Sequence, residues 1–99
     1  MMRRFNRIVS SSKPVLVDFY ADWCMPCRLM PAVLREVKNQ YRENVRIVKV
    51  NVDHYPDIAL SCKVQNIPSV VLFQDGKIQW SGMGVQHVND ISIALREIL

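Results

Sequence analysis

The strongest constraint on the fold is a strand–helix–strand pattern in the first half of the chain. Residues Val15–Tyr20 form a short apolar run of β-branched and aromatic side chains, which predicts a strand buried on both faces. From Cys27 the apolar residues recur with helical spacing, and a second strand-like run follows at Val45–Val52. Strand, helix and strand of these lengths predict a βαβ unit with two parallel strands.

The helix of this unit has a clear apolar side and one irregularity. Leu29, Val33, Val37 and Tyr41 recur every four residues and are expected to face the core. Pro31 lies within the same stretch. Because a proline ring clashes with the carbonyl four residues earlier, Pro31 is expected to kink the helix.

The second half of the chain predicts a short helix, a hairpin and a closing helix. The short helix is expected over residues 56–64, with Ile58, Leu60 and Cys62 facing the core. Two strand-like runs, 69–74 and 77–81, are separated by Asp75-Gly76, which is a strong signal for a two-residue hairpin turn. With a first helix within the opening dozen residues and a last one from about residue 89, the expected order is α-β-α-β-α-β-β-α.

Length and composition are those of one small globular domain. The 99 residues are 49% hydrophobic and 22% charged, so we expect a single domain over residues 1–99. The longest apolar run, Val70–Phe73, is far too short for a membrane span, and no export signal is visible, so we expect a cytoplasmic protein without a membrane association. The net charge of +4 comes without a nucleic-acid recognition motif. We therefore expect the basic residues to form solvated faces that favour acidic protein partners.

Three cysteines carry the main chemical signal. An odd number excludes a typical secreted disulfide scaffold, and two of the three form the motif Cys24-Met25-Pro26-Cys27. The motif falls where a strand ends and a helix begins, where unpaired amides and the helix dipole stabilise a thiolate. Pro26 is tolerated there because its missing N–H has no partner in the first turn. The spacing also brings the two sulfurs close enough to bridge.

Other roles for the cysteines remain open at this stage. Cys24 and Cys27 could be half of a zinc site completed by His54 and Cys62, although those two candidates are isolated rather than paired in a local cluster. A C-x-x-C beside a βαβ pattern favours a redox pair, so we expect no metal. Cys62 itself fits a small apolar core residue, and regulatory oxidation is the alternative.

Asp18 is the one charged residue inside the first apolar strand. Burial of a carboxylate is expensive unless it is paired or protonated, and desolvation would raise its pKa toward neutrality. Such a group suits a proton shuttle, but it could equally be an inward aspartate that hydrogen-bonds a neighbouring strand. Lys49 lies on the strand that the βαβ rule places alongside, and it is the nearest candidate counter-charge.

Taken together, these residues resemble the thioredoxin family. Residues 17–27 are similar to the family's strand, tryptophan and redox motif, and Ile67-Pro68-Ser69 resembles the segment that holds the family's cis-proline. Asp75-Gly76 and Gly84 match the hairpin and the late glycine that follow. The resemblance covers about residues 5–99. It implies an α/β thioredoxin fold, with a central mixed sheet of about four strands flanked by helices and the first family strand missing.

The resemblance also implies roles for the catalytic positions. Cys24 would attack a substrate disulfide and Cys27 would resolve the mixed disulfide. Asp18 would move the proton of Cys27, with Lys49 tuning it.

The substrate-binding positions implied by the resemblance surround the cysteine pair. Pro68, if cis, would shape the groove, and the backbone of Ile67 would pair with an extended substrate. The residues expected to contact substrate are Trp23, Met25, Pro26, Ile67, Pro68 and Gly84.

The expected function is therefore reduction of protein disulfides by dithiol–disulfide exchange, in electron transport and redox homeostasis. No cofactor is expected beyond the disulfide itself, since no flavin or nicotinamide motif is present. The partners would be a thioredoxin reductase-type electron donor and disulfide-containing proteins, and the chain is expected to be a monomer.

The family usually has Gly-Pro between the cysteines, whereas this chain has Met25-Pro26. A disulfide oxidant or isomerase with a raised potential therefore stays open, as does a zinc-holding or protein-binding module with little turnover.

Overall fold

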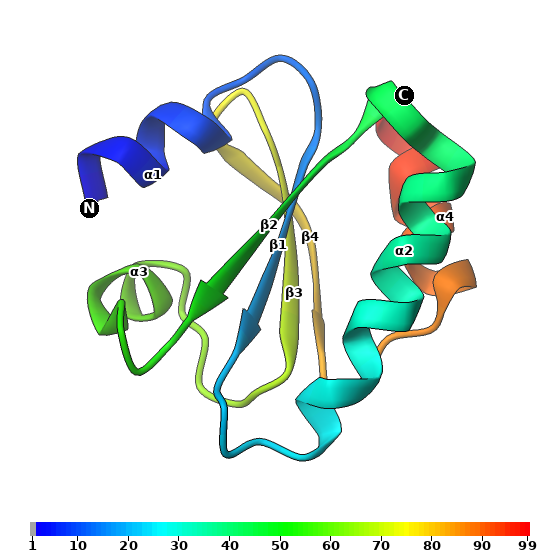
Figure 1. The fold of residues 1–99 in the computed structure, drawn as a ribbon. Helices are drawn as coiled ribbons and strands as arrows, with labels where there is room; N and C mark the ends of the chain where they lie inside the picture. Colours follow the sequence, from blue (N-terminus) through cyan, green and yellow to red (C-terminus); the bar gives the residue numbers. More distant parts are fainter. Residues whose placement is uncertain (1) are drawn as a thin grey trace.

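Four strands form a central sheet that has helices on both faces (Figure 1). The computed structural model describes residues 2–99, and none of the helices in that range is long and apolar enough to cross a membrane. In chain order the elements are α1 (Met2–Val9), β1 (Val15–Tyr20), the 3₁₀ helix η1 (Pro26–Leu29), α2 (Met30–Tyr41), the 3₁₀ helix η2 (Arg42–Asn44), β2 (Arg46–Asn51), α3 (Pro56–Ser61), β3 (Ser69–Gln74), β4 (Lys77–Met83) and α4 (Val88–Ile98).

The sheet is mixed and has the strand order β2-β1-β3-β4. β1 pairs in parallel with β2, as the βαβ pattern predicts, and antiparallel with β3. β4 closes the far side as the antiparallel partner of β3. The buried strand β1 therefore lies at the centre, which explains why nearly all of its residues are apolar. Asp18 of β1 is directly opposite Lys49 of β2 in the register.

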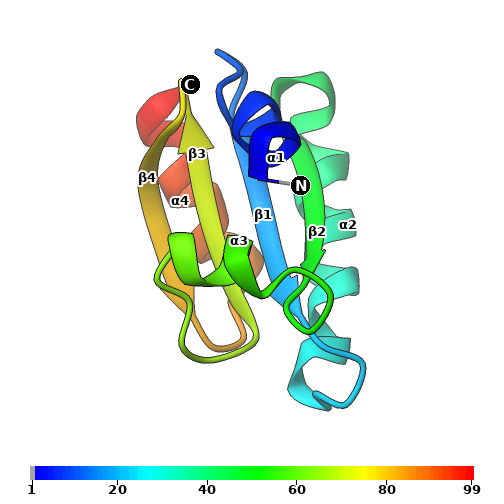
Figure 2. The same ribbon diagram turned by 90° about the vertical axis from the view of Figure 1, so that its left-hand side faces the viewer.

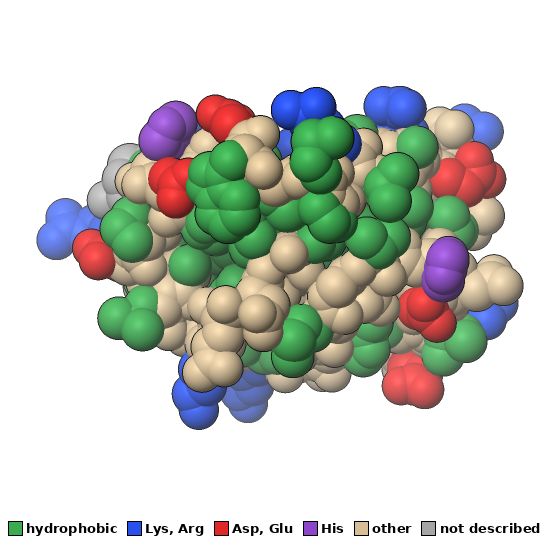
Figure 3. Space-filling view, turned by 90° about the horizontal axis from the view of Figure 1, so that it is seen from below, with side chains coloured by type: hydrophobic (Ala, Val, Ile, Leu, Met, Phe, Trp, Pro, Cys, Tyr) green, Lys and Arg blue, Asp and Glu red, His purple; other side chains and the backbone are tan. Residues whose placement is uncertain are grey.

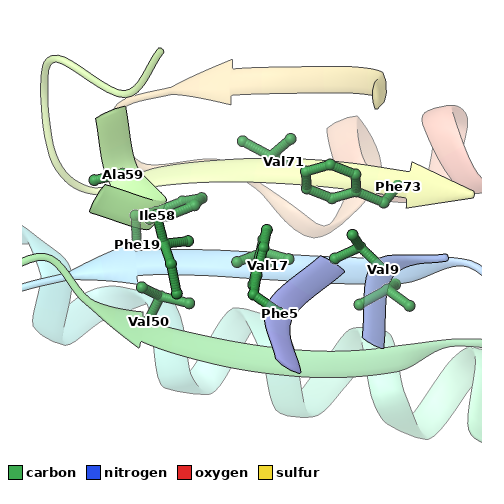
Figure 4. Packing of buried hydrophobic residues seen from close by; sticks show 10 residues of the cluster. Phe5, Val9, Val17, Phe19, Val50, Ile58, Ala59, Val71 and Phe73 are labelled. Atoms are coloured by element: carbon green, nitrogen blue, oxygen red, sulfur yellow. The ribbon is translucent and has the colours of Figure 1, made fainter. Parts of the chain in front are cut away.

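Two separate apolar clusters attach the helices to the sheet. On one face, α1 and α3 cover a cluster that includes Phe5, Val17 and Ile58 (Figure 4). On the other face, α2 and α4 cover a cluster that includes Leu34 and Leu95. Alternate residues of β1, β2 and β3 enter opposite clusters, as strand geometry requires. Figure 2 shows the two helical layers on opposite sides of the sheet.

The β3–β4 turn confirms the predicted hairpin and also holds the segment that follows α1. Asp75 and Gly76 both have positive φ, at 54° and 79°, as a two-residue turn of this type requires. Their amides donate hydrogen bonds to the carbonyls of Ser11 and Val9, at 2.9 Å each. The Gln74 side-chain amide donates a further bond to the Ser12 carbonyl, at 3.0 Å. The hairpin tip therefore fixes the connection between α1 and β1.

The helix after the cysteines differs from the prediction in two ways. It begins as the 3₁₀ turn η1 and becomes α-helical at Met30, so Pro31 lies in the first turn of α2, where its missing N–H leaves no hydrogen bond unmade. The predicted kink is therefore replaced by a change of helix type. Leu29, predicted to be buried, is 60% exposed, and Met30 is buried in its place. A 3₁₀ turn has three residues per turn, which shifts the phase of the buried side.

In α3 the prediction for Leu60 is wrong. Leu60 is exposed, while Ile58 and Ala59 are buried and Cys62 is half-buried. Leu60 is two positions after Ile58, which is about 200° around a helix. The two side chains therefore cannot face the same core.

We expect Phe5→Ala to destabilise the fold by about 3 kcal/mol, as typical for removal of a buried aromatic ring. Phe5 is buried and its ring meets that of Phe73 edge to face, with the centroids 5.7 Å apart. Urea unfolding monitored by circular dichroism measures the change. The matched control is Ile93→Ala on α4, where the side chain is half exposed and the expected change is within about 0.5 kcal/mol. Equal losses in both variants would contradict the role given to Phe5.

Candidate functional site

The two cysteines of the motif form a disulfide at the beginning of the long helical stretch. Cys24 and Cys27 are bridged, with their Cα atoms 5.4 Å apart. The Cys27 amide donates to the Cys24 sulfur at 3.3 Å, so the sulfur lies at the amide-rich start of η1. Both residues are almost fully buried, at 4% and 5% exposure. Exposure alone therefore does not distinguish the roles of the two cysteines.

Their surroundings do distinguish them. Cys27 lines a cavity of about 340 Å³ together with Asp18, Lys49 and Pro31, and Cys24 does not line it. Cys24 instead packs with Ala21 and Ile67 in a small apolar cluster that also includes Cys27. One sulfur therefore has access to ionisable groups and the other to an apolar surface.

Asp18 is buried in the sheet without a salt bridge or a strong partner. The residue is 1% exposed, and its Oδ1 atom has no hydrogen-bond partner within residues 2–99. Burial raises the pKa of Asp18 from 3.8 to about 6, and the positive charge of Lys49 partly opposes that rise. The carboxyl can therefore exchange a proton near neutral pH. The alternative of an aspartate hydrogen-bonded to a neighbouring strand is not what the structure shows for Oδ1.

Lys49 extends from β2 beside this carboxyl. Its backbone is the register partner of Asp18, and its Nζ atom lies 5.9 Å from the centroid of the Tyr20 ring. The lysine is exposed, so water screens its attraction for Asp18. Lys49 therefore offsets only part of the rise in the pKa of the carboxyl, which stays above its usual value.

Trp23 and Met25 present apolar surface next to the disulfide. Their side chains are 68% and 65% exposed, and Pro26 beside them is also exposed. The indole Nε1 of Trp23 donates to Oδ2 of Asp53 at 2.8 Å, which holds the ring in place. The Asp53 amide in turn donates to Oδ1 of Asn51. Asp53 and Asn51 were not identified from the sequence, because their bonds depend on how the loop after β2 folds back.

The segment before β3 lies on the other side of the cysteines. Ile67 packs against the cysteine cluster, and the Ile67–Pro68 peptide bond is cis, as the family resemblance implied. The Gly84 amide donates to the Pro68 carbonyl at 2.8 Å, and Gly84 has φ of 85°, which favours glycine. Gly84 thus supports Pro68. Met83, 70% exposed at the end of β4, was a further residue that the sequence did not indicate.

All of these segments meet at one end of the sheet. Figure 3 shows this end, where apolar side chains occupy the middle of the face and most charged side chains lie toward its rim. An apolar face around a disulfide is suited to contact with another protein.

His54 and Cys62 do not complete a metal site with the cysteine pair. No group of three or more His, Cys, Asp or Glu residues within the described chain, 2–99, is arranged to hold a metal ion. Cys62 lies at the end of α3, where burial raises the pKa of its thiol. Cys62 packs against the cluster under α1 and α3 rather than against Cys24.

The chemistry available here is exchange between a dithiol and a disulfide. The bridged pair can accept two electrons, a carboxyl that titrates near neutrality lies on the Cys27 side, and an apolar face surrounds the sulfurs. Fold and site together define a thiol–disulfide oxidoreductase.

Comparison with known proteins gives the family. The family model described as thioredoxin matches residues 1–97. The chain belongs to the thioredoxin family, as a protein-disulfide reductase with Cys24–Cys27 as its active-site disulfide.

Individual relatives agree with this assignment. A thioredoxin-like protein of Synechocystis sp. is 43% identical over 80 residues, which is 81% of this chain and 76% of that protein. Thioredoxin 1 of Synechococcus elongatus is 44% identical over 72 residues, covering 73% of this chain and 67% of the relative. The structure of oxidised mitochondrial thioredoxin 3 from Saccharomyces cerevisiae superposes with a TM-score of 0.87 at 31% identity, over 97% of this chain and 89% of the other. The thioredoxin fold predicted from the sequence is confirmed.

Proposed function

We propose that the two cysteines divide the reaction between them. The Cys24 thiolate attacks one sulfur of a substrate disulfide, forms a mixed disulfide, and releases the other substrate sulfur as a thiol. Cys27 then loses its proton, attacks the Cys24 sulfur, and releases the second substrate thiol. The substrate gains two electrons and two protons, and the Cys24–Cys27 bond is formed again.

The observation that carries this proposal is the asymmetry of the two sulfurs. The Cys27 amide donates to the Cys24 sulfur, and such a bond stabilises a thiolate on Cys24. Cys27, by contrast, shares its cavity with Asp18 and Lys49. A carboxylate there can accept the Cys27 proton directly or through water, for which a cavity of this size has room. Lys49 sets how readily that carboxylate is protonated.

The substrates we propose are proteins that present a disulfide on an extended segment. The exposed side chains of Trp23, Met25 and Pro26 offer apolar contact on one side of the disulfide. Ile67 and Pro68 lie on the other side, with Gly84 holding Pro68, and the Ile67 backbone is available for strand addition.

The family implies a reductase as electron donor, and we propose a donor of the thioredoxin reductase type acting on a monomer.

We also propose a cytoplasmic location. Cys62 is a free thiol, and unpaired cysteines persist where glutathione and thioredoxin systems keep thiols reduced. Imaging of the full chain fused to a fluorescent protein in its native cells tests the location. Accumulation in an organelle or outside the cell would contradict it.

We expect the reduction potential of the Cys24–Cys27 pair to be near that of a reductant, about −270 mV. Equilibration against glutathione buffers, with the two redox forms separated after thiol alkylation, measures it. The same measurement tests the second candidate, a disulfide oxidant, which is open because Met25 stands where the family usually has glycine. A potential near about −120 mV would contradict the reductant role. Met25→Gly tests whether this residue sets the value, with Leu60→Gln on α3 as an exposed control.

A further inference from the structure

β2 is an edge strand with an unpaired outer side. It pairs only with β1 in the described sheet, and in Figure 2 no strand lies beyond it, with α2 behind that edge. The Arg46 amide donates to Pro14 and the Val52 amide to Tyr20, so even-numbered residues direct their backbone groups toward β1. Because strand geometry alternates, the N–H and C=O groups of Ile47 and Lys49 face the open edge. Four backbone groups there are free to pair with an added strand.

A cavity lies on each face of this edge. On the face covered by α1 and α3, a cavity of about 420 Å³ is lined mainly by apolar side chains, among them Phe5, Ile8 and Ile58. On the opposite face, a cavity of about 220 Å³ lies between α2 and β2, beside Leu34 and Ile47. Successive side chains of an extended segment point to opposite faces. A strand added along Ile47 and Lys49 would therefore direct its side chains alternately into the two cavities.

The charges around both cavities have one sign. Among the described residues, five cations and no acidic side chain line them: Arg4, Arg35, Lys38, Arg46 and Lys49. A second copy of the chain is a poor occupant, because edge pairing would bring these five cations against five others. An acidic segment would instead be attracted from both faces.

We propose that the outer edge of β2 binds an acidic, extended segment of a partner protein, which adds as a fifth strand. Backbone bonds to Ile47 and Lys49 set its register, and an apolar side chain enters the larger cavity. The acidic side chains before and after that apolar residue point to the opposite face, where they pair with Arg35, Lys38 and Lys49. This surface shares Lys49 with the cavity beside Cys27, but it lies apart from the apolar face around the disulfide and does not depend on the roles proposed for the cysteines.

The test uses the full chain and a capped nine-residue peptide of alternating valine and glutamate, labelled for fluorescence anisotropy. We expect saturable binding that weakens as salt is raised, and slower hydrogen exchange of the Ile47 and Lys49 amides. With the valines in the larger cavity the glutamates face Arg35 and Lys38, so the double variant Arg35→Glu/Lys38→Glu should weaken binding by about tenfold, because each exposed charge pair contributes modestly. Lys77→Glu/Arg96→Glu makes the same change of charge away from β2; it is the matched control and should bind as the parent does.

A second variant probes the backbone bonds. Ile47→Pro removes an N–H that faces the open edge, a place where proline is tolerated, and should also weaken binding. Reduction of a small-molecule disulfide should be unchanged in these variants, which shows that they fold.

Four results would overturn the proposal. These are no saturable binding at millimolar peptide, equal binding of a peptide with lysine in place of glutamate, affinity unchanged by both sets of variants, or protection of the Ile47 and Lys49 amides without peptide. If that protection grows with protein concentration together with a dimer in sedimentation, the occupant is a second copy.

Discussion

Cys27→Ser is expected to convert the protein into a trap for its substrates. With Cys24 intact, attack on a substrate disulfide still forms the mixed disulfide, but no second thiol is present to resolve it. Turnover with a disulfide protein such as insulin should fall by at least about 10³-fold, the scale of loss when a member of a covalent catalytic unit is removed. Mass spectrometry should find the substrate attached to Cys24.

Cys24→Ser supplies the opposite case. It should lose turnover to the same extent and accumulate no adduct, because Cys27 lies on the cavity side of the disulfide with Asp18. Both variants are best made in a Cys62→Ser background, since Cys62 is a free thiol that could capture substrate by itself. Cys62→Ser alone is the control and should retain full turnover. Adducts on Cys27 in the Cys24→Ser variant would reverse the proposed division of roles.

Asp18→Asn is expected to raise stability and lower activity at the same time. The pKa of Asp18 is raised from 3.8 to about 6, so the ionised carboxylate is disfavoured in the folded protein. At about 1.4 kcal/mol for each pKa unit, the cost of ionisation is on the order of 3 kcal/mol. Asparagine has the same shape and carries no charge, so it removes this cost without leaving a cavity.

The gain in stability from Asp18→Asn is expected to depend on pH. Between pH 3.8 and about 6 the folded state holds a proton that the unfolded state has lost, so stability falls as pH rises through this window. Above it the full cost is present. We therefore expect Asp18→Asn to be more stable than the parent at pH 8, by up to about 3 kcal/mol, and nearly equal below pH 3.8. Urea unfolding of the oxidised proteins at the two pH values measures the difference.

The activity of the same variant tests the proton-transfer role. Without a carboxylate on the Cys27 side, resolution of the mixed disulfide should slow by about 10²-fold at neutral pH, as for loss of a general base. The rate of the parent should increase as pH rises through about 6, and the variant should lack that step. Asp75→Asn, an exposed change in the β3–β4 turn away from this cavity, is the control for both measurements. If Asp18→Asn is more stable but resolves as fast as the parent, Asp18 is not the base.

The fold was predictable where one physical rule dominated. The βαβ unit followed from an apolar strand, a helical repeat and a second strand, and the hairpin followed from Asp75-Gly76. The errors at Leu29 and Leu60 arose where helices were short or began as a 3₁₀ turn. In such turns the phase of the buried side depends on two or three residues, and periodicity over so few positions does not fix it.

The site was predictable to the extent that its residues are unusual for their surroundings. Cys24, Cys27 and Asp18 stand out because thiols at a helix start and an acid within a buried strand each need a reason. Asp53 did not stand out, because an aspartate in a loop is ordinary, and only the folded chain brings it 2.8 Å from the Trp23 indole. Likewise, the open edge of β2 depends on strand order, which local pattern does not reveal.

The hairpin tip that holds the end of α1 also bears on the order in which the chain can assemble. Val9 and Ser11 bond to Gly76 and Asp75, more than sixty positions later in the chain. During synthesis, the first helix leaves the ribosome long before the residues that hold it have been made. α1 can therefore reach its final place only after the β3–β4 hairpin has emerged, so its docking is a late event in folding.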